Sequence, residues 1–342
     1  LIFYLSIYIF FKKAQKKINY KILLIIILFL CFEPTIIQFN SSFMTESIYF
    51  SFLILLLSFL IDLKKNFITN VVIGLIIGIM YLQRTVSLYL IFPIIIYYIY
   101  CFKNLPSVLK SIFFILIGQI IVLTFLGYSN YKRADIFYIS PWQTKFAMYY
   151  YITDDLVSKA NKIDLNEAKK KRIAEKKIWI EDNKIDLYKE RDRRKLYNYY
   201  QGYFFEKFKT YPYEGIKIVV WKSLQTAILD PGFVYSYIHQ DKTMKKYWKI
   251  NNLFELPEKI IYSLMIYLFS FIGFVYCLKK KNNLTILFLL IGLYHISVLG
   301  WTGVSRYSVP SLICISLFFA NGVFSIKLFH EKNNFNSLFK RK

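Results

Sequence analysis

The sequence predicts an all-α integral membrane protein, a multi-span helical bundle with a mainly helical exoplasmic domain inserted between the sixth and seventh spans. Three observations support this fold class. The chain has 342 residues, of which 56% are hydrophobic and 20% are aromatic. Apolar runs of about 16 to 20 residues alternate with short Lys-rich gaps, and a helix of roughly 20 residues crosses the hydrocarbon layer of a bilayer. Most of the acidic residues gather in one long central segment.

About nine apolar segments are candidate membrane spans. In chain order they cover residues 1–11, 22–38, 47–61, 67–82, 86–101, 111–127, 259–278, 284–299 and 307–326. The first segment is too short to cross a bilayer as a helix. We therefore expect it to be a partial span, with a further span and loop upstream of Leu1. In the fourth segment Gly74 and Gly78 form a GxxxG pattern, which predicts close packing against another helix.

The placement of basic residues predicts which gaps face the cytoplasm, because cytoplasmic loops are enriched in Lys and Arg. Alternate gaps contain Lys12, Lys13, Lys16, Lys17 and Lys21, then Lys64 and Lys65, then Lys103 and Lys110, then Lys279, Lys280 and Lys281, and finally Lys327 with the tail Lys340, Arg341 and Lys342. The opposite short gaps hold only Arg84 and Arg306. Nine spans therefore give one consistent topology, with a basic cytoplasmic tail.

This topology divides the chain into an N-terminal bundle (1–127), an exoplasmic domain (128–258) and a C-terminal bundle with its tail (259–342). The central domain contains 25 of the 45 basic and 17 of the 21 acidic residues. Long loops of this kind cross a membrane largely regardless of charge. Asp164 followed by Glu167 is typical of a helix start. The Lys/Arg cluster of this domain fits a solvated face, or attraction to anionic lipid head groups.

Residues 213–229, which follow Pro212, form an amphipathic pattern. Ile216, Val220, Leu224, Ala227 and Ile228 share one helical face. Such a helix lies in a membrane interface or packs against the exported domain, and the pattern alone leaves both alternatives open.

Several classes of function are disfavoured. A formal net charge of +24 suggests nucleic acid in a soluble protein, but here its placement indicates membrane orientation, so no nucleic-acid partner is expected. The sequence contains no Walker loop, GxGxxG, GxSxG or HExxH motif, which argues against nucleotide-driven chemistry. All four cysteines lie in apolar runs without a CxxC partner and are interpreted as packing residues: Cys31, Cys101, Cys277 and Cys314.

The candidate site consists of charged residues at the outer ends of spans. Glu46 opens the third segment, Arg84 lies between the fourth and fifth, and Arg306 with Tyr307 opens the last. Charge at this level is costly unless it faces a partner or a water-filled cavity, which predicts an outward-facing polar site. The alternatives are snorkelling of Arg84 and Arg306 to lipid phosphates, and favourable interaction of Glu46 with a helix dipole.

Three further polar features are weighed in the same way. Glu33, directly before Pro34, either lines the same cavity or caps a Pro-kinked turn. His295 is either a metal ligand or proton relay, or a satisfied buried histidine. Asp154 and Asp155 resemble a catalytic carboxylate pair, but paired acids at a helix start are more often caps.

Four passages, in this order, resemble the GT-C membrane glycosyltransferases, particularly the protein O-mannosyltransferase and lipid A aminoarabinose transferase group. They are Pro34 to Leu60 with Thr45-Glu46, Gly74 to Pro93 with Gly78, Leu82 and Arg84, Phe205 to Pro231 with Pro212, and Ser305-Arg306-Tyr307 with Pro310 leading into Asn321 and Gly322. Together they extend over nearly the whole chain.

The resemblance implies an inverting enzyme that takes a sugar from a polyprenyl-phosphate carrier on the outer face and transfers it to a lipid, glycan or protein acceptor. It implies that Arg306, Tyr307 and Arg84 contact the donor phosphate, and that Glu46, Glu33 and His295 belong to the acceptor pocket. In this family the general base lies in the first outer loop, which here would precede Leu1, so no catalytic base is assigned. No cofactor is required by this chemistry, and although a divalent metal is compatible with it, no metal site is predicted.

Other readings remain open. An O-antigen polymerase or ligase also combines many spans with a large outer loop and a polyprenyl-linked substrate. A polyprenyl-lipid transporter should show inverted repeats and discontinuous helices in both halves, and the sequence shows neither. For an enzyme of this kind the expected location is a bacterial inner membrane, with the large domain in the periplasm and membrane lipids around the bundle.

Overall fold

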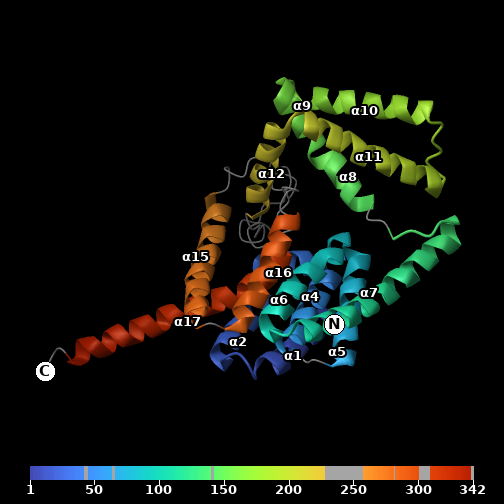
Figure 1. The fold of residues 1–342 in the computed structure, drawn as a ribbon. Helices are drawn as coiled ribbons and strands as arrows, with labels where there is room; N and C mark the ends of the chain where they lie inside the picture. The colour runs from blue at the N-terminus through green and yellow to red at the C-terminus, as the bar shows by residue number, and fades with distance from the viewer. Residues whose placement is uncertain are drawn as a thin grey trace. The chain divides into compact units, whose positions relative to one another are not determined.

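The computed structural model describes residues 1–41, 45–63, 66–139, 142–227, 257–280, 282–299 and 309–339. Within these ranges all regular secondary structure is helical (Figure 1). The all-α class predicted from the apolar runs is therefore confirmed. The described residues form two compact units, one comprising 1–120 and 226–339 without the gaps, and the other comprising 121–225.

The first unit contains most of the apolar helices. They are α1 (Ile2–Ala14), α2 (Tyr20–Phe32), α3 (Pro34–Ser41), α4 (Thr45–Ile61), α5 (Phe67–Gln83), the 3-10 helix η1 (Thr85–Leu90), α6 (Ile91–Phe102), the first half of α7 (Leu105–Ala134), α15 (Pro257–Lys279), α16 (Asn283–Leu299) and α17 (Val309–Phe339). α17 packs on α15, α16 and α2, and α4 packs on α1 and α5, so helices from both ends of the chain share one core.

Four of the helical stretches are long and apolar enough to cross a membrane: Thr85–Phe102, Leu105–Arg133, Ile260–Lys279 and Val309–Ile326. Four shorter apolar helices accompany them: Tyr20–Phe32, Ser47–Ile61, Phe67–Gln83 and Asn283–Val298. Length and composition thus support a membrane protein in general terms. The count of nine spans and the topology stay predictions.

The outer surface of α7 fits such an environment. Leu109, Phe113, Leu116 and Ile120 recur at helical spacing and are all exposed. A stripe of large apolar side chains facing water would be unfavourable, whereas the same stripe facing hydrocarbon is expected.

The predicted second span, 22–38, is not one helix, and this prediction is wrong in its detail. α2 ends at Phe32, and α3 begins at Pro34. Glu33 between them has an extended backbone, with φ −63° and ψ 122°. The physical reason is local, because a proline disfavours helical backbone in the residue before it and cannot donate a backbone hydrogen bond.

Three other boundaries also differ from the predicted ones. The fifth predicted span (86–101) begins as the 3-10 helix η1 and becomes α-helical only at Ile91. α7 is longer than the predicted 111–127, and α17 continues to Phe339 beyond the predicted end at 326. Helices continue past the apolar stretch because hydrogen bonding, unlike membrane insertion, does not require apolar side chains.

Two pairs of glycines let helices of the first unit approach closely. Gly74 in α5 faces Gly118 in α7, and a Cβ atom on either would lie 2.0 to 2.2 Å from a backbone oxygen of the other helix. Gly273 in α15 and Gly322 in α17 form a second crossing, where the corresponding distances are 1.8 and 1.9 Å. The close packing predicted at Gly74 is therefore confirmed, and its partner is Gly118.

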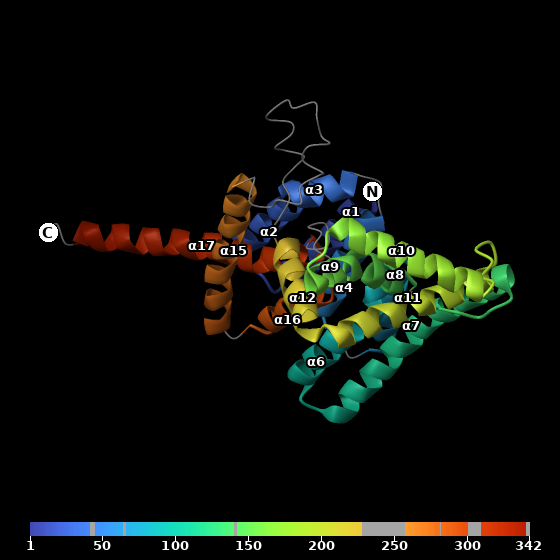
Figure 2. The same ribbon diagram turned by 90° about the horizontal axis from the view of Figure 1, so that it is seen from above.

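The second unit contains the remainder of α7 and α8 (Trp142–Tyr151), α9 (Thr153–Asn161), α10 (Leu165–Asp182), α11 (Glu190–Thr210) and α12 (Pro212–Ala227). α10 and α11 lie side by side in both views (Figure 1, Figure 2), where Trp179 stacks on Tyr199 with ring centres 4.5 Å apart. The predicted helix start at Asp164 is confirmed, since its carboxylate accepts a hydrogen bond from the backbone N–H of Asn166. Glu167 pairs with Lys171.

α12 presents an apolar stripe outward. Tyr213, Ile216, Val220 and Leu224 are 54% to 72% exposed. On the other side Ile218 is buried with Leu156 and Phe204 in a small core of this unit. Within the described part of α12, the apolar stripe is thus not the face that packs on the unit. Ile228 and Leu229, the end of the predicted helix, lie outside the described residues.

Candidate functional site

Arg84 lies in a break between two helices. α5 ends at Gln83, Arg84 has an extended backbone (φ −145°, ψ 117°), and η1 begins at Thr85. The Arg84 side chain is buried, with 8% of its surface exposed. Its guanidinium carbon lies 5.7 Å from the centre of the Tyr49 ring, within cation–π range. A fixed positive charge is therefore held against an aromatic face inside the apolar unit.

Tyr49 connects this cation to His295. The Tyr49 hydroxyl and His295 Nε2 are 2.9 Å apart, and both side chains are fully buried. His295 Nδ1 lies 2.8 Å from the carbonyl oxygen of Ile291. Because a carbonyl can only accept, Nδ1 carries the proton, and in the neutral ring Nε2 accepts the proton of the Tyr49 hydroxyl. Both ring nitrogens are thus engaged, as in a satisfied buried histidine.

The segment that carries Arg84 is positioned by two other helices. Tyr294 of α16 donates a hydrogen bond to the backbone oxygen of Val86. The side-chain amide of Gln119 in α7 donates to the backbone oxygen of Leu88 over 3.2 Å. These contacts tie the backbone of η1, the segment that follows Arg84, to α16 and α7.

Arg84, expected at the donor phosphate, and His295, expected in the acceptor pocket, both contact Tyr49. Glu46 lies in the first turn of α4, three residues before Tyr49, but its side chain lies outside the described residues. Arg306 and Tyr307, the predicted donor-phosphate residues of the last span, also lie outside the described residues. The role of this group in binding a substrate stays a prediction.

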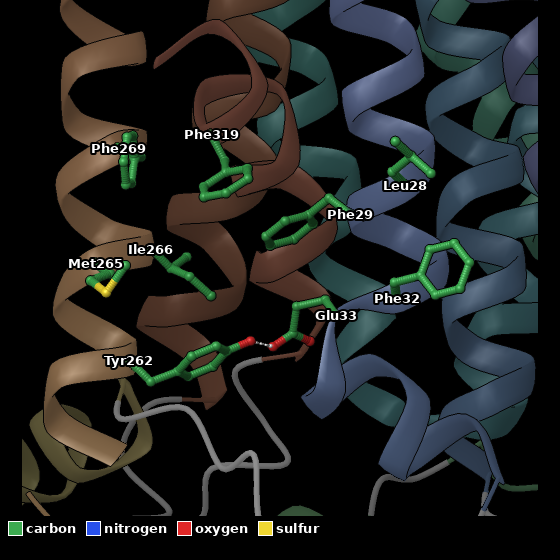
Figure 3. A pocket seen from close by; sticks show the side chains of 9 residues that line it. All are labelled: Leu28, Phe29, Phe32, Glu33, Tyr262, Met265, Ile266, Phe269 and Phe319. Carbon is green, nitrogen blue, oxygen red and sulfur yellow. Dashed lines mark hydrogen bonds between the residues drawn. The ribbon is translucent and has the colours of Figure 1, made fainter. Parts of the chain in front are cut away.

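Of the two alternatives that the sequence left open for Glu33, capping of the turn at Pro34 is confirmed. Its carboxylate caps α3, because Oε2 accepts from the backbone N–H of Ile36 over 2.7 Å and Oε1 accepts from the Thr35 hydroxyl over 2.8 Å. Oε1 also accepts from the hydroxyl of Tyr262 in α15 over 2.6 Å. At the same time Glu33 lines a cavity of about 320 Å³ (Figure 3). Neither Arg84 nor His295 is among the residues that line it.

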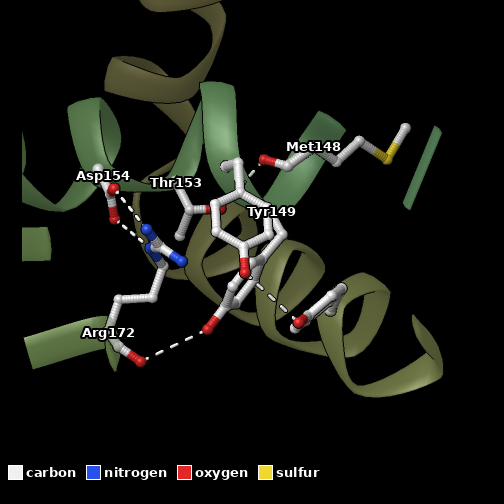
Figure 4. A network of polar contacts seen from close by, with 7 residues as sticks. Met148, Tyr149, Thr153, Asp154 and Arg172 are labelled. Carbon is white, nitrogen blue, oxygen red and sulfur yellow. Dashed lines mark hydrogen bonds and ion pairs between the residues drawn. The ribbon is translucent and has the colours of Figure 1, made fainter. Parts of the chain in front are cut away.

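The acidic pair of the second unit is explained by ion pairs. Asp154 accepts two hydrogen bonds from Arg172, at 2.5 and 2.9 Å, in a buried bidentate pair (Figure 4). Asp155 pairs with Lys222 of α12 at 2.6 Å. Neither residue is the N-cap, which is Ile152. Interpretation of the two as caps is therefore wrong in detail, and they instead tie α9 to α10 and α12.

Arg172 is the centre of the network in Figure 4. Its guanidinium carbon lies 4.6 Å from the Tyr149 ring centre and 4.5 Å from that of Tyr150. Burial disfavours its charge, but the hydrogen bonds and charge of Asp154 outweigh burial and raise the pKa of Arg172. Burial raises the pKa of the Tyr149 phenol. An arginine held in this way is a structural brace between α8, α9 and α10.

Two residues that organise the site were missed by sequence reasoning. Tyr49 and Tyr262 lie in apolar runs rich in aromatic residues, where a tyrosine is interpreted as a core packing residue. Their partners are 246 and 229 residues away in sequence. One signal in the sequence could have indicated them. A tyrosine in an apolar run is expected to be buried, and a buried tyrosine hydroxyl needs a hydrogen-bond partner.

The described residues contain no group of three or more His, Cys, Asp or Glu side chains that could hold a metal ion. Comparison with known proteins gives no match: no family model, no curated protein and no solved structure is similar to this chain.

Proposed function

We propose that this protein is a membrane-embedded glycosyltransferase, which moves a sugar from a polyprenyl-phosphate-linked donor to a lipid, glycan or protein acceptor with inversion. The observation that carries the proposal is the burial of Arg84 beside Tyr49 among apolar helices. Ionisable residues within membrane bundles are costly, and they mark substrate sites by default. The order of sequence passages that resembles the GT-C glycosyltransferases adds the reaction class to this argument.

The chemistry assigns a role to such a cation. The acceptor oxygen attacks the anomeric carbon from the side opposite the phosphate, and the bond between that carbon and the phosphate oxygen breaks. The phosphate leaves with the electron pair, and the acceptor proton passes to a carboxylate. Negative charge grows on the phosphate during this step, so a fixed guanidinium next to it lowers the barrier. Arg84, and in the proposal Arg306 with Tyr307, would supply that charge.

The proposed setting is the outer face of a bacterial inner membrane, with about nine spans and the unit that contains α8 to α12 in the periplasm. The outward apolar stripe of α12 supports an interfacial position for that helix, because amphipathic helices in an interface bury such a stripe among lipids. The opposite face of α12 is already engaged through Lys222 and Ile218.

The test is a transfer assay with the protein expressed from its complete reading frame and reconstituted in nanodiscs. Radiolabelled polyprenyl-phosphate-sugar is supplied with extracted membrane lipids, and labelled products are separated from the donor. We expect Arg84→Gln and Arg306→Ala to lower the rate by about 100-fold or more, as losses of charge stabilisation do. Lys110→Gln, which removes an exposed cation from α7, should leave the rate unchanged.

Two results would contradict the proposal. The first is movement of the labelled lipid across the bilayer without a new glycosidic bond, which favours a transporter. The second is transfer whose rate is the same in the Arg84→Gln variant and in the unmodified protein. Repeated addition of preassembled oligosaccharides would assign the chain to the O-antigen polymerase or ligase class instead.

A further inference from the structure

A groove in the first unit is nearly all apolar. It lies between α2, α15 and α17 and has a volume of about 320 Å³ (Figure 3). Its lining consists of Leu28, Phe29, Phe32, Glu33, Tyr262, Met265, Ile266, Phe269 and Phe319. Binding sites for small molecules begin at about this volume, so the groove accommodates one slender chain and not a bulky glycan.

The groove opens on the apolar surface of the unit. Leu28, Phe32 and Met265 are 47%, 69% and 54% exposed, whereas Ile266 is buried. Leu264 and Leu268, on the same helix as Met265, are also exposed. Because α15 and α17 are long and apolar enough to cross a membrane, this opening faces hydrocarbon when the helices are inserted. The material next to it is then the chains of lipids.

One end of the groove is polar. There the hydroxyl of Tyr262 donates to Glu33 over 2.6 Å, and Figure 3 shows the two side chains directed toward each other. Oε1 of Glu33 accepts from the hydroxyls of both Tyr262 and Thr35, and Oε2 accepts from the backbone N–H of Ile36. A carboxylate oxygen can accept more than one hydrogen bond, and Glu33 is the one carboxylate among the residues that line the groove.

We infer that this groove binds the hydrocarbon chain of a lipid whose polar end is a hydroxyl group donating to Glu33, and that it rejects a lipid phosphate. The apolar lining takes the chain, and the Glu33 carboxylate takes the hydroxyl proton donor. A phosphate has no hydrogen to donate when fully ionised, and its charge repels the carboxylate strongly where water is excluded. None of the nine lining residues is Lys or Arg, so nothing in the lining offsets that repulsion.

This inference deepens the proposed function and depends on it only for the role of the lipid. The donor phosphate requires a cation, which Arg84 provides away from this lining. The groove would then hold the acceptor, and the acceptor would be a hydroxyl-bearing lipid.

Photolabelling tests the inference without measuring transfer. The protein in nanodiscs is labelled with a photoactivatable long-chain alcohol or with the phosphate monoester of the same chain, and the modified residues are mapped by mass spectrometry. We expect the alcohol to label α2 and α15 at the groove about tenfold more efficiently than the phosphate, a difference of about 1.4 kcal/mol. Excess unlabelled alcohol, but not excess phosphate, should compete.

Two variants at the rim make the test specific. Met265→Trp places an indole at the opening and should reduce groove labelling by about tenfold. Leu264→Trp adds the same group to a neighbouring exposed position outside the lining and should not reduce it. Glu33→Gln removes the charge and should raise labelling by the phosphate toward that of the alcohol. Because Glu33 also caps α3, the comparison of the two tryptophan variants stands even if this variant does not fold.

The inference is overturned if the unmodified protein is labelled equally by both probes, if labelling lies elsewhere, or if Met265→Trp and Leu264→Trp have the same effect. Failure of the proposed glycosyltransferase function would be a different result, because it is measured by sugar transfer and not by photolabelling. A protein without transferase activity that still prefers the alcohol at the groove would refute the glycosyltransferase and leave the lipid site in place.

Discussion

The hydroxyl of Tyr49 lies 2.9 Å from Nε2 of His295 and joins α4 to α16 across the centre of the first unit. Both residues are fully buried, so neither can exchange this hydrogen bond for one with water. His295 is in turn tied to the backbone of its own helix at Ile291. The pair therefore fixes the position of the aromatic face on which Arg84 lies.

Tyr49→Phe should lower the stability of the protein by about 1 to 3 kcal/mol, because it leaves a buried ring nitrogen without its donor. The measurement is the midpoint of thermal unfolding in detergent, followed by circular dichroism. Tyr20→Phe is the matched control, since Tyr20 is 64% exposed and should show no change. Equal midpoints for the two variants would mean that the Tyr49 hydrogen bond contributes nothing to stability.

The helices and the polar contacts differ in how far sequence predicts them. Apolar runs located nearly every helix of the first unit, because membrane spans and buried helices are both specified by local composition. Pro34 disfavours helical backbone at Glu33, but the apolar run continues through this point because hydropathy averages over one polar residue.

Contacts between side chains that are far apart in the chain could not be predicted from the sequence. Nothing near Glu33 indicates Tyr262, and nothing near Arg84 indicates that His295 reaches it through Tyr49. Such pairs depend on which faces of distant helices meet, and helix packing decides this through many small contacts. Gly74 was predicted in part. Its small size indicates a close crossing of two helices, but the sequence does not identify Gly118 as its partner.

Gly273→Ala and Gly322→Ala should each destabilise the packing of α15 on α17. A Cβ atom at these positions would lie 1.8 and 1.9 Å from the backbone oxygens of Phe318 and Phe269, so the helices must separate. Overpacking of this kind costs about 1 to 3 kcal/mol or more. Thermal unfolding in detergent is again the readout.

Gly202→Ala is the control for the glycine variants. Gly202 lies within α11, and a Cβ atom there would meet nothing within 4 Å. Removal of the extra backbone freedom of glycine should raise stability by about 0.4 to 1 kcal/mol. If all three glycine variants lower the midpoint equally, close approach is not the reason that Gly273 and Gly322 are required.

Arg172→Met should destabilise the second unit by about 3 to 5 kcal/mol, because it leaves the carboxylate of Asp154 buried without its partner. The double variant with Asp154→Leu should recover much of the loss, since an apolar pair has no charge to desolvate. Limited proteolysis of α8 to α12, with mapped cleavage sites, reports on this unit. Lys171→Met, which removes an exposed ion pair with Glu167, should change the cleavage rate little. A double variant as labile as the single one would refute the explanation by unpaired charge.

The buried tyrosines Tyr149 and Tyr203 should make the stability of the second unit fall at alkaline pH. Burial raises the pKa of Tyr149, and burial together with Glu175 raises that of Tyr203. The unfolded-state pKa of a tyrosine phenol is about 10. A phenol whose pKa is higher than this in the folded state contributes its full share to the folding stability below a pH of about 10. The contribution is lost as pH rises through the folded pKa, because the unfolded chain then releases the proton more readily.

The measurement is a difference titration of tyrosinate absorbance between the unmodified protein and Tyr203→Phe. The phenol that is missing in the variant should titrate above the unfolded-state value of about 10, together with unfolding of the unit. Tyr213→Phe, which removes a 72% exposed phenol from the same unit, is the control variant. The prediction fails if both differences have the same midpoint.

A spin label at Val220→Cys should report a lipid environment for the exposed stripe of α12. In nanodiscs, collisions of the label with oxygen should exceed those with a water-soluble nickel chelate, because oxygen concentrates among acyl chains. Val220 shares this stripe with Ile216 and Leu224, and burying it among lipids removes apolar area from water. Lys217, which is exposed beside them, can extend its amine to the head groups.

Lys177→Cys on α10, where the lysine is 76% exposed, is the control and should favour the nickel chelate. A label at Val220 that meets both reagents as the control does would place the stripe in water, and one that meets neither would indicate burial against protein.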